Sequence, residues 1–172
     1  NWREMIFWAK EVEVKIGFSV FTKNYWEALE KADFIKIAAA QFDDISSLLP
    51  YLHYIKSFKP PKPIFYSYRM DQDLNAIKKL IHEASPSGLS YAMAVRSEYP
   101  THIESAKILI DHAAKTQDIT WGYSCHTPKA EAILYALQRG ATLFEVHYTL
   151  DHEQSDFRDH KTSFNYEELA DL

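Results

Sequence analysis

The chain has 172 residues, of which 47% are hydrophobic and 25% charged, a composition that predicts one folded domain over residues 1–172. Its net charge of −5 argues against nucleic acid or an anionic membrane as a partner, and no apolar run approaches the roughly 20 residues that span a bilayer. The single cysteine, Cys125, excludes an internal disulfide, so we expect a reducing, cytoplasmic environment.

The predicted elements alternate between short apolar strands and longer stretches with helical periodicity. The chain begins inside an amphipathic helix, with apolar side chains at Trp2, Ile6 and Phe7, as expected of a segment cut from a longer protein. Helices are predicted further along near residues 24–31, 44–56, 72–83, 102–115 and 127–139. Six strands are predicted, at Gly17–Phe21, Asp33–Ala38, Pro63–Ser67, Leu89–Val95, Thr120–Ser124 and Thr142–Tyr148.

Proline and glycine mark the limits of two of these helices. Thr127 is predicted to cap the N-terminus of the last helix, with Pro128 as its first residue and Gly140 just after its end. Pro50 lies inside the 44–56 stretch, where its missing N–H is expected to split or kink the helix.

The strand runs, such as Phe34–Ala38, are nearly continuous in apolar residues. Such runs are typical of parallel strands covered by helices, so the expected fold class is α/β. Two architectures fit the alternation: an open doubly wound sheet and part of a (β/α)8 (TIM) barrel. The sequence has no glycine-rich loop of the GxGxxG or GxxxxGK type, which argues against a Rossmann or P-loop domain.

Polar residues gather at the carboxyl ends of the predicted strands. In a parallel α/β fold these ends lie on one face, and that face carries the active site. The sequence therefore predicts a site there. Its candidate residues, in strand order, are Lys36, Ser67, Ser97, Glu98, Tyr99, Ser124, Cys125, His126 and His147.

His126 and His147 form the strongest chemical pair, because they end neighbouring predicted strands. Two neutral imidazoles with a carboxylate or water suit Mn²⁺, Zn²⁺ or Fe²⁺ and leave positions open for substrate oxygens. The alternative is that each histidine is a hydrogen-bonded structural residue. Spacing alone leaves both interpretations open.

Three further features each allow two interpretations. Cys125 is a nucleophile or third ligand, or simply a small buried thiol, which the lack of a partner motif favours. Lys36, inside an apolar strand, forms a Schiff base or holds a phosphate. The charged run Asp156–Lys161 is a solvated loop, or it places Asp159 or His160 beside the site for proton transfer.

Six motifs resemble those of the N-acetylneuraminate (sialic acid) synthase family, in one register from Ile16 to Leu169. Ser97–Thr101 matches that family's SEYPT outright. Gly122–Thr127 resembles GYSDHT, Glu145–Asp151 resembles EKHFTLD, Asp159–Ser163 resembles DHKAS, Lys36–Gln41 resembles KIASGE, and Ser67–Met70 resembles STGM. Any one motif is weak, but six in order at matching spacing are specific.

The resemblance implies six of the eight units of a (β/α)8 barrel and a condensation of phosphoenolpyruvate with an N-acetylated amino sugar aldehyde such as N-acetylmannosamine. It implies a divalent metal, Mn²⁺ or Mg²⁺, on His126 and His147, and it leaves a homodimer possible. Phosphoenolpyruvate is expected to contact Lys36, Ser67, Ser97 and Ser124. Gln41, Tyr99 and Asp159 match residues near the sugar and are expected to take part in catalysis.

The sequence also departs from the family pattern. Ala39 and Gln41 replace the serine and glutamate of KIASGE, Cys125 replaces the aspartate of GYSDHT, and Val146 replaces a lysine. Arg69 replaces the glycine of STGM, where it supplies a compensating cation or fills the pocket. The first two βα units and the family's small C-terminal domain lie outside this sequence.

These departures leave three hypotheses. The first is an active, divergent synthase. The second is a catalytically silent barrel that retains sugar binding, since Ala39 and Gln41 lie at the heart of the expected site. The third is an aldolase or lyase that uses Lys36 as a Schiff base.

Overall fold

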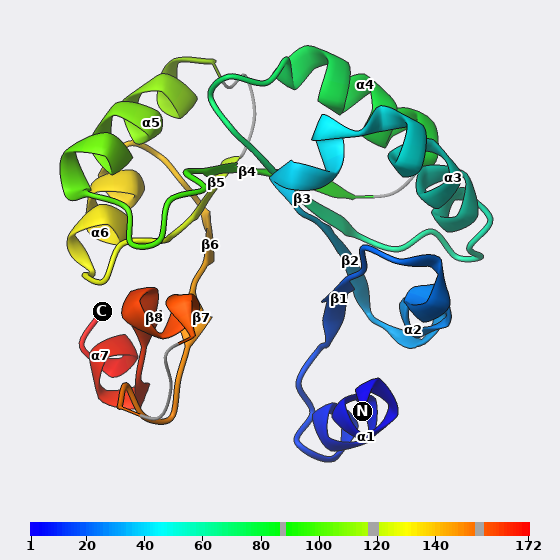
Figure 1. Ribbon diagram of the computed structural model, residues 1–172, viewed down its shortest axis with the longest axis horizontal. Helices are drawn as coiled ribbons and strands as arrows, with labels where there is room; N and C mark the ends of the chain where they lie inside the picture. Colours follow the sequence, from blue (N-terminus) through cyan, green and yellow to red (C-terminus); the bar gives the residue numbers. More distant parts are fainter. Residues whose placement is uncertain (87–88, 117–120, 154–156) are drawn as a thin grey trace. The chain divides into compact units, whose positions relative to one another are not determined.

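The computed structural model describes residues 1–172 except 87–88, 117–120 and 154–156 (Figure 1). Thr120 of the fifth predicted strand and Asp156 of the charged run therefore lie outside the described residues. The contacts divide the chain into two compact units. Unit 1 contains residues 1–66 and 73–91, and unit 2 contains residues 67–72 and 92–172.

The main sheet has six strands in sequential order, β1-β2-β3-β4-β5-β6. The pairs β1–β2, β2–β3, β4–β5 and β5–β6 are parallel. This confirms the predicted α/β class with strands in chain order, and it excludes the reversed order of a doubly wound sheet. The strands are β1 (Gly17–Ser19), β2 (Phe34–Ile37), β3 (Ile64–Tyr68), β4 (Ser90–Val95), β5 (Trp121–Ser124) and β6 (Leu143–Glu145).

In unit 1 the helices α3 and α4 lie side by side (Figure 1). Their apolar faces bury Leu52, Ile77 and Ile81, while β2 buries Ile35 and Ile37 on one side of the strand. Burial of this apolar surface is the main stabilising contribution to the unit. Its helical elements are α1 (Trp2–Glu11), η1 (Lys23–Tyr25), α2 (Trp26–Lys31), η2 (Ala39–Asp43), α3 (Ile45–Lys56) and α4 (Leu74–Ala84).

Aspartates cap the N-termini of α3 and α4. The Asp44 carboxylate accepts hydrogen bonds from the Ser47 backbone N–H and from the Ser46 and Ser47 hydroxyls, which lower its pKa to about 2. Asp73 accepts from two backbone N–H groups at the start of α4. Pro50 was expected to split or kink the helix, and it does not split it, because α3 continues through Pro50 to Lys56.

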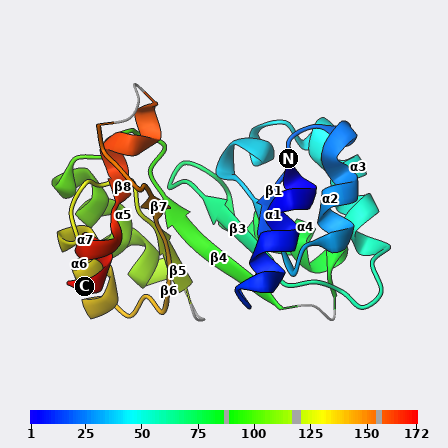
Figure 2. The same ribbon diagram turned by 90° about the horizontal axis from the view of Figure 1, so that it is seen from below.

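In unit 2 the helices α5 (Ile103–Thr116) and α6 (Glu131–Gln138) pack together on the same side of β5 and β6 (Figure 2). Leu109, Ile110 and Tyr123 are almost completely buried in this layer. The remaining elements are β7 (His147–Tyr148), η3 (Arg158–Thr162), β8 (Ser163–Phe164) and α7 (Tyr166–Ala170).

Two predictions, one about the sixth strand and one about the start of α6, are wrong. The sixth strand does not run to Tyr148: it ends at Glu145, and His147 lies in β7, which pairs with Ser163 of β8 in a separate two-stranded sheet. Thr127 does not cap α6, which begins at Glu131. Its hydroxyl instead donates to the Lys129 carbonyl oxygen and contacts the Cys125 thiol.

The predicted end of α6 is confirmed. Gly140 follows the last turn with φ of +92°, a conformation that only glycine adopts without strain. Nowhere in the described residues does a helix have both the length and the apolar character required to cross a bilayer.

Candidate active site

Three rings meet at the carboxyl ends of the strands in unit 2. The Tyr99 ring stacks on the His126 ring with 4.1 Å between centroids, and the His126 and His147 centroids are 5.3 Å apart. Tyr99 also meets His147 edge-on at 5.9 Å. The expected convergence of the two histidines is therefore observed, and Tyr99 packs against both.

The loop after β4 fixes His126 from two directions. The Thr101 backbone N–H donates to the His126 carbonyl oxygen at 2.7 Å. The ring Nδ1 lies 2.6 Å from the Arg96 carbonyl oxygen, which can only accept, so Nδ1 carries the proton. Nε2 is then the basic nitrogen of the ring, in the form that binds a metal or accepts a proton.

Electrostatics keep His126 neutral at physiological pH. Burial lowers its pKa from 6.5 to about 4, and the nearby His147 acts in the same direction. The hydrogen bond to Arg96 and the negative charges of Glu145 and Asp159 oppose this shift without cancelling it. A neutral imidazole is the form required of a metal ligand.

His147 and Asp159 are brought close by the small sheet. His147 pairs with Ser163, and the Asp159 carbonyl oxygen accepts from the hydroxyls of Thr162 and Ser163 at 3.0 and 2.8 Å. The predicted sugar-side residue Asp159 is therefore held in the segment that pairs with the strand of His147. Its effect on the pKa of His126 places its charge within electrostatic range of the ring cluster.

The donor set available to a metal consists of the two imidazoles. No group of three or more His, Cys, Asp or Glu side chains in the described part of the chain is arranged to hold an ion. Cys125 does not supply a third ligand: it is fully buried, its Sγ lies 3.1 Å from Thr127 Oγ1, and burial raises the pKa of its thiol. The arrangement fits a metal with two protein ligands whose other positions are taken by water or substrate.

The predicted phosphoenolpyruvate contacts differ in exposure. Ser67 at the end of β3 and Ser124 at the end of β5 are buried, whereas Ser97 after β4 is exposed. Ser97 lines a cavity of about 430 Å³ together with Arg69 and Arg96. Sequence reasoning missed Arg96, although a basic residue directly after a strand at the carboxyl face was a usable signal.

Lys36 and Gln41 belong to unit 1. Lys36 is half-buried in β2, opposite Ser19 and Phe65 in the neighbouring strands. The Gln41 amide bonds to the backbone at both ends: its Oε1 accepts from the Ala38 N–H at 3.0 Å, and its Nε2 donates to the Val20 carbonyl oxygen at 3.2 Å. Gln41 therefore ties the end of β2 to the segment after β1.

Replacing Gln41 by glutamate is expected to destabilise the protein by about 1–2 kcal/mol, because a carboxylate facing the Val20 carbonyl cannot donate. Chemical denaturation at neutral pH measures the change. The exposed Gln138→Glu variant is the control and is expected to change stability much less. Equal stability of Gln41→Glu and the parent protein would show that the bond to Val20 contributes nothing.

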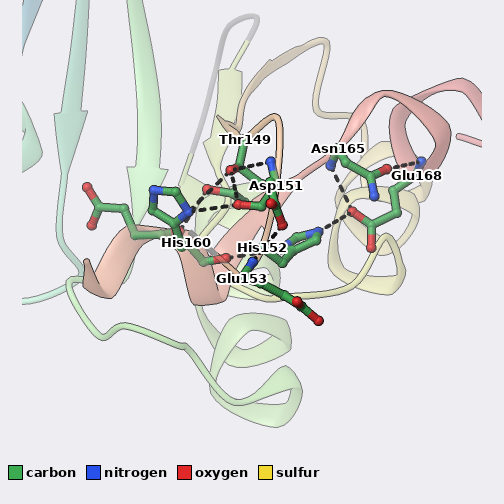
Figure 3. A network of polar contacts seen from close by, with 9 residues as sticks. Thr149, Asp151, His152, Glu153, His160, Asn165 and Glu168 are labelled. Atoms are coloured by element: carbon green, nitrogen blue, oxygen red, sulfur yellow. Dashed lines mark hydrogen bonds and ion pairs between the residues drawn. The ribbon is translucent and has the colours of Figure 1, made fainter. Parts of the chain in front are cut away.

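The His160 side chain makes hydrogen bonds to the segment that follows β7. Its Nδ1 contacts the Thr149 hydroxyl at 3.2 Å and the Asp151 carbonyl oxygen at 3.3 Å (Figure 3). His152 bridges to Glu168, with Nε2 and Oε2 3.1 Å apart. Glu168 also accepts from the Asn165 N–H while Asn165 caps the Glu168 N–H, so this network begins α7.

The bond to Glu168 raises the pKa of His152 above 6.5. Because the pKa of His152 is higher in the folded protein than in the unfolded chain, the His152–Glu168 pair stabilises the fold fully below about pH 6.5. This stabilisation is lost as the pH rises through the raised pKa of His152. Glu168→Gln is expected to return the pKa of His152 towards 6.5, as measured by an NMR titration of the His152 ring protons. Glu167→Gln removes a neighbouring charge and serves as the control. A His152 pKa unmoved by Glu168→Gln would contradict the bridge.

Solved structures that share this fold over nearly the whole chain include the two that follow. An N-acetylneuraminic acid (sialic acid) synthetase from Leptospira borgpetersenii serovar Hardjo-bovis, in complex with citrate, aligns with a TM-score of 0.81 and 18% identity. A Chromobacterium violaceum ATCC 12472 protein assigned to spore coat polysaccharide biosynthesis (protein E) aligns with 0.72 and 24%. The alignments cover 99% and 98% of this chain but only 60% and 51% of the solved chains.

These likenesses define the class of fold as the parallel α/β sheet of sialic acid synthases. The sequence matches the NeuB family over residues 1–172, so the chain belongs to the NeuB family. No curated protein compared with the sequence gave a significant match.

Proposed function

We propose that this chain is the major part of a (β/α)8-barrel synthase that condenses phosphoenolpyruvate with an N-acetylated amino sugar aldehyde, such as N-acetylmannosamine, and releases phosphate. The observation that carries the proposal is the contact of Tyr99, His126 and His147 in a member of the NeuB family. These three residues lie in the segments that match SEYPT, GYSDHT and EKHFTLD.

His126 and His147 would hold a divalent ion, Mn²⁺ or Mg²⁺, through their ring nitrogens. The ion would polarise the sugar aldehyde and stabilise the negative charge that develops on its oxygen. The role of this chain is to orient the two rings: the Arg96 carbonyl fixes the tautomer of His126, and Tyr99 restricts the rotation of both.

The substrate anion would be bound by Lys36 and by the hydroxyls of Ser67, Ser97 and Ser124. These four residues match the family's phosphoenolpyruvate-binding residues, and a phosphate monoester and a carboxylate require a cation and hydrogen-bond donors of these types. Asp159 and Tyr99 would contact the sugar, with Asp159 accepting a hydroxyl proton or hydrogen bond. In this scheme Gln41 supports the backbone rather than the chemistry.

The test is release of phosphate from phosphoenolpyruvate by the complete protein, with Mn²⁺ and a panel of N-acetylated amino sugars. Sugar-dependent release that stops on addition of a chelator supports the synthase. Release without any sugar would indicate a phosphatase. No release with any sugar, combined with sugar binding in calorimetry, would instead identify a silent binding barrel. Sugar-dependent chemistry trapped by borohydride at Lys36 would indicate a Schiff-base enzyme.

A further inference from the structure

A cavity of about 430 Å³ lies in unit 2 between the loops that follow β3 and β4. Two arginines line it, Arg69 from the first loop and Arg96 from the second, together with the hydroxyl-bearing Ser97. The carboxylates of Asp71 and Glu98, which pair with these arginines, line it as well. We propose that Arg69 and Arg96 form a binding site for the phosphate monoester group of a substrate. This inference rests on the proposed function, which requires a phosphorylated substrate, and it adds a subsite to it.

Each arginine of the cavity is paired with a carboxylate that a bound phosphate would replace. Arg69 Nε lies 3.1 Å from Asp71 Oδ1, and Arg96 Nη2 lies 3.0 Å from Glu98 Oε1. The Asp71 side chain is 73% exposed against 23% for Arg69, and Glu98 is 48% exposed against 36% for Arg96. The carboxylates therefore reach further into solvent than the guanidinium groups they hold.

Because the carboxylates of both pairs are exposed to solvent, water screens the pairs, and a more strongly bound anion can replace the carboxylates. A phosphate dianion between two guanidinium groups makes bidentate, charge-assisted hydrogen bonds, which are stronger than those of a single carboxylate. The apolar walls at Val95 and Leu109 exclude water on one side and strengthen that attraction. In the absence of a bound anion, Asp71 and Glu98 pair with the two arginines.

The cavity is connected to the ring cluster through the main chain. The carbonyl oxygen of Arg96 accepts the hydrogen bond from His126 Nδ1. Ser97, the next residue, lines the cavity itself. A phosphate bound by the Arg96 side chain would therefore be held by the same residue whose carbonyl oxygen orients His126. A substrate anchored there would have its reacting end directed by the same loop.

Calorimetric titration with inorganic phosphate tests the site without any turnover. Arg69→Ala and Arg96→Ala are each expected to weaken phosphate binding at least tenfold. Arg139→Ala is the matched control, because Arg139 also lies in unit 2 in an exposed pair, with Asp111, and its removal is expected to leave binding unchanged. Asp71→Asn and Glu98→Gln should tighten binding severalfold, a change that partial unfolding cannot produce.

Equal phosphate affinity in the parent, Arg69→Ala and Arg96→Ala proteins would overturn the site, as would weaker binding in Asp71→Asn and Glu98→Gln. Because the probe is inorganic phosphate, binding in a protein that performs no condensation would support the site while refuting the proposed function. In an active protein, KM measurements then separate the two sources of the group. A rise in KM for phosphoenolpyruvate in both arginine variants assigns the site to that substrate, and a loss confined to phosphorylated amino sugars assigns it to the acceptor.

Discussion

The double variant His126→Ala, His147→Ala is expected to abolish Mn²⁺ binding and to reduce phosphate release by about a thousandfold or more, a cost of about 4 kcal/mol in transition-state stabilisation. The two rings are the only pair of imidazoles shown in mutual contact among the described residues, with centroids 5.3 Å apart. Removing both leaves no nitrogen donor in the cluster. Calorimetry with Mn²⁺ and a phosphate-release assay measure the two effects on the complete protein.

Each single variant is expected to weaken Mn²⁺ binding, and His126→Ala more than His147→Ala, because only His126 has its ring fixed by the Arg96 carbonyl. The exposed His82, in the last turn of α4, gives the matched control His82→Ala. Circular dichroism confirms that each variant is folded. Unchanged Mn²⁺ affinity in a folded double variant would show that both histidines are structural.

Replacing Gly122 by alanine is expected to destabilise the protein by about 2–3 kcal/mol. A Cβ at this position would lie 2.9 Å from the Leu143 carbonyl oxygen and 2.9 Å from Met93 Cγ. The methionine side chain can move, but the carbonyl belongs to the backbone of β6, which pairs with β5 at Gly122. The substitution therefore forces two hydrogen-bonded strands apart.

Thermal and urea unfolding measure this change, and Gly140→Ala is the comparison. At Gly140 a Cβ would meet no atom within 4 Å, so alanine there suffers only from the positive φ. That strain costs about 1–2 kcal/mol. Gly122→Ala should thus be the more destabilising of the two, and the opposite ranking would show that β5 and β6 separate easily.

The order of the strands was predictable because it depends on local patterns. Apolar runs of strand length alternate with helical periodicity, and short connections of this kind join neighbouring parallel strands. The convergence of Tyr99, His126 and His147 followed from the same rule, since each was expected near a strand end on one face. Their distances and the tautomer of His126 required the three-dimensional structure.

What the sequence did not reveal depends on packing and pairing that a local pattern does not show. Pro50 stays inside a helix because the buried residues on both sides of it, Leu48 and Leu52 among them, favour one continuous element. His147 leaves the main sheet because Ser163 offers it another partner. The amide of Gln41 bonds to Val20, 21 residues earlier, which no local motif reveals.

Two main-chain groups of the β4–α5 loop form hydrogen bonds with His126: the carbonyl of Arg96 and the N–H of Thr101. Every amino acid has such a carbonyl, and all except proline have such an N–H. The side chain at position 96 can therefore be exchanged while the imidazole keeps its orientation. In the proposed site, anion binding by the side chain at position 96 is therefore separable from alignment of the His126 ring by the main chain. A library randomised at position 96 should yield variants in which the anion preference of the proposed site is altered and the Mn²⁺ affinity is intact, so this position is a favourable starting point for redesign.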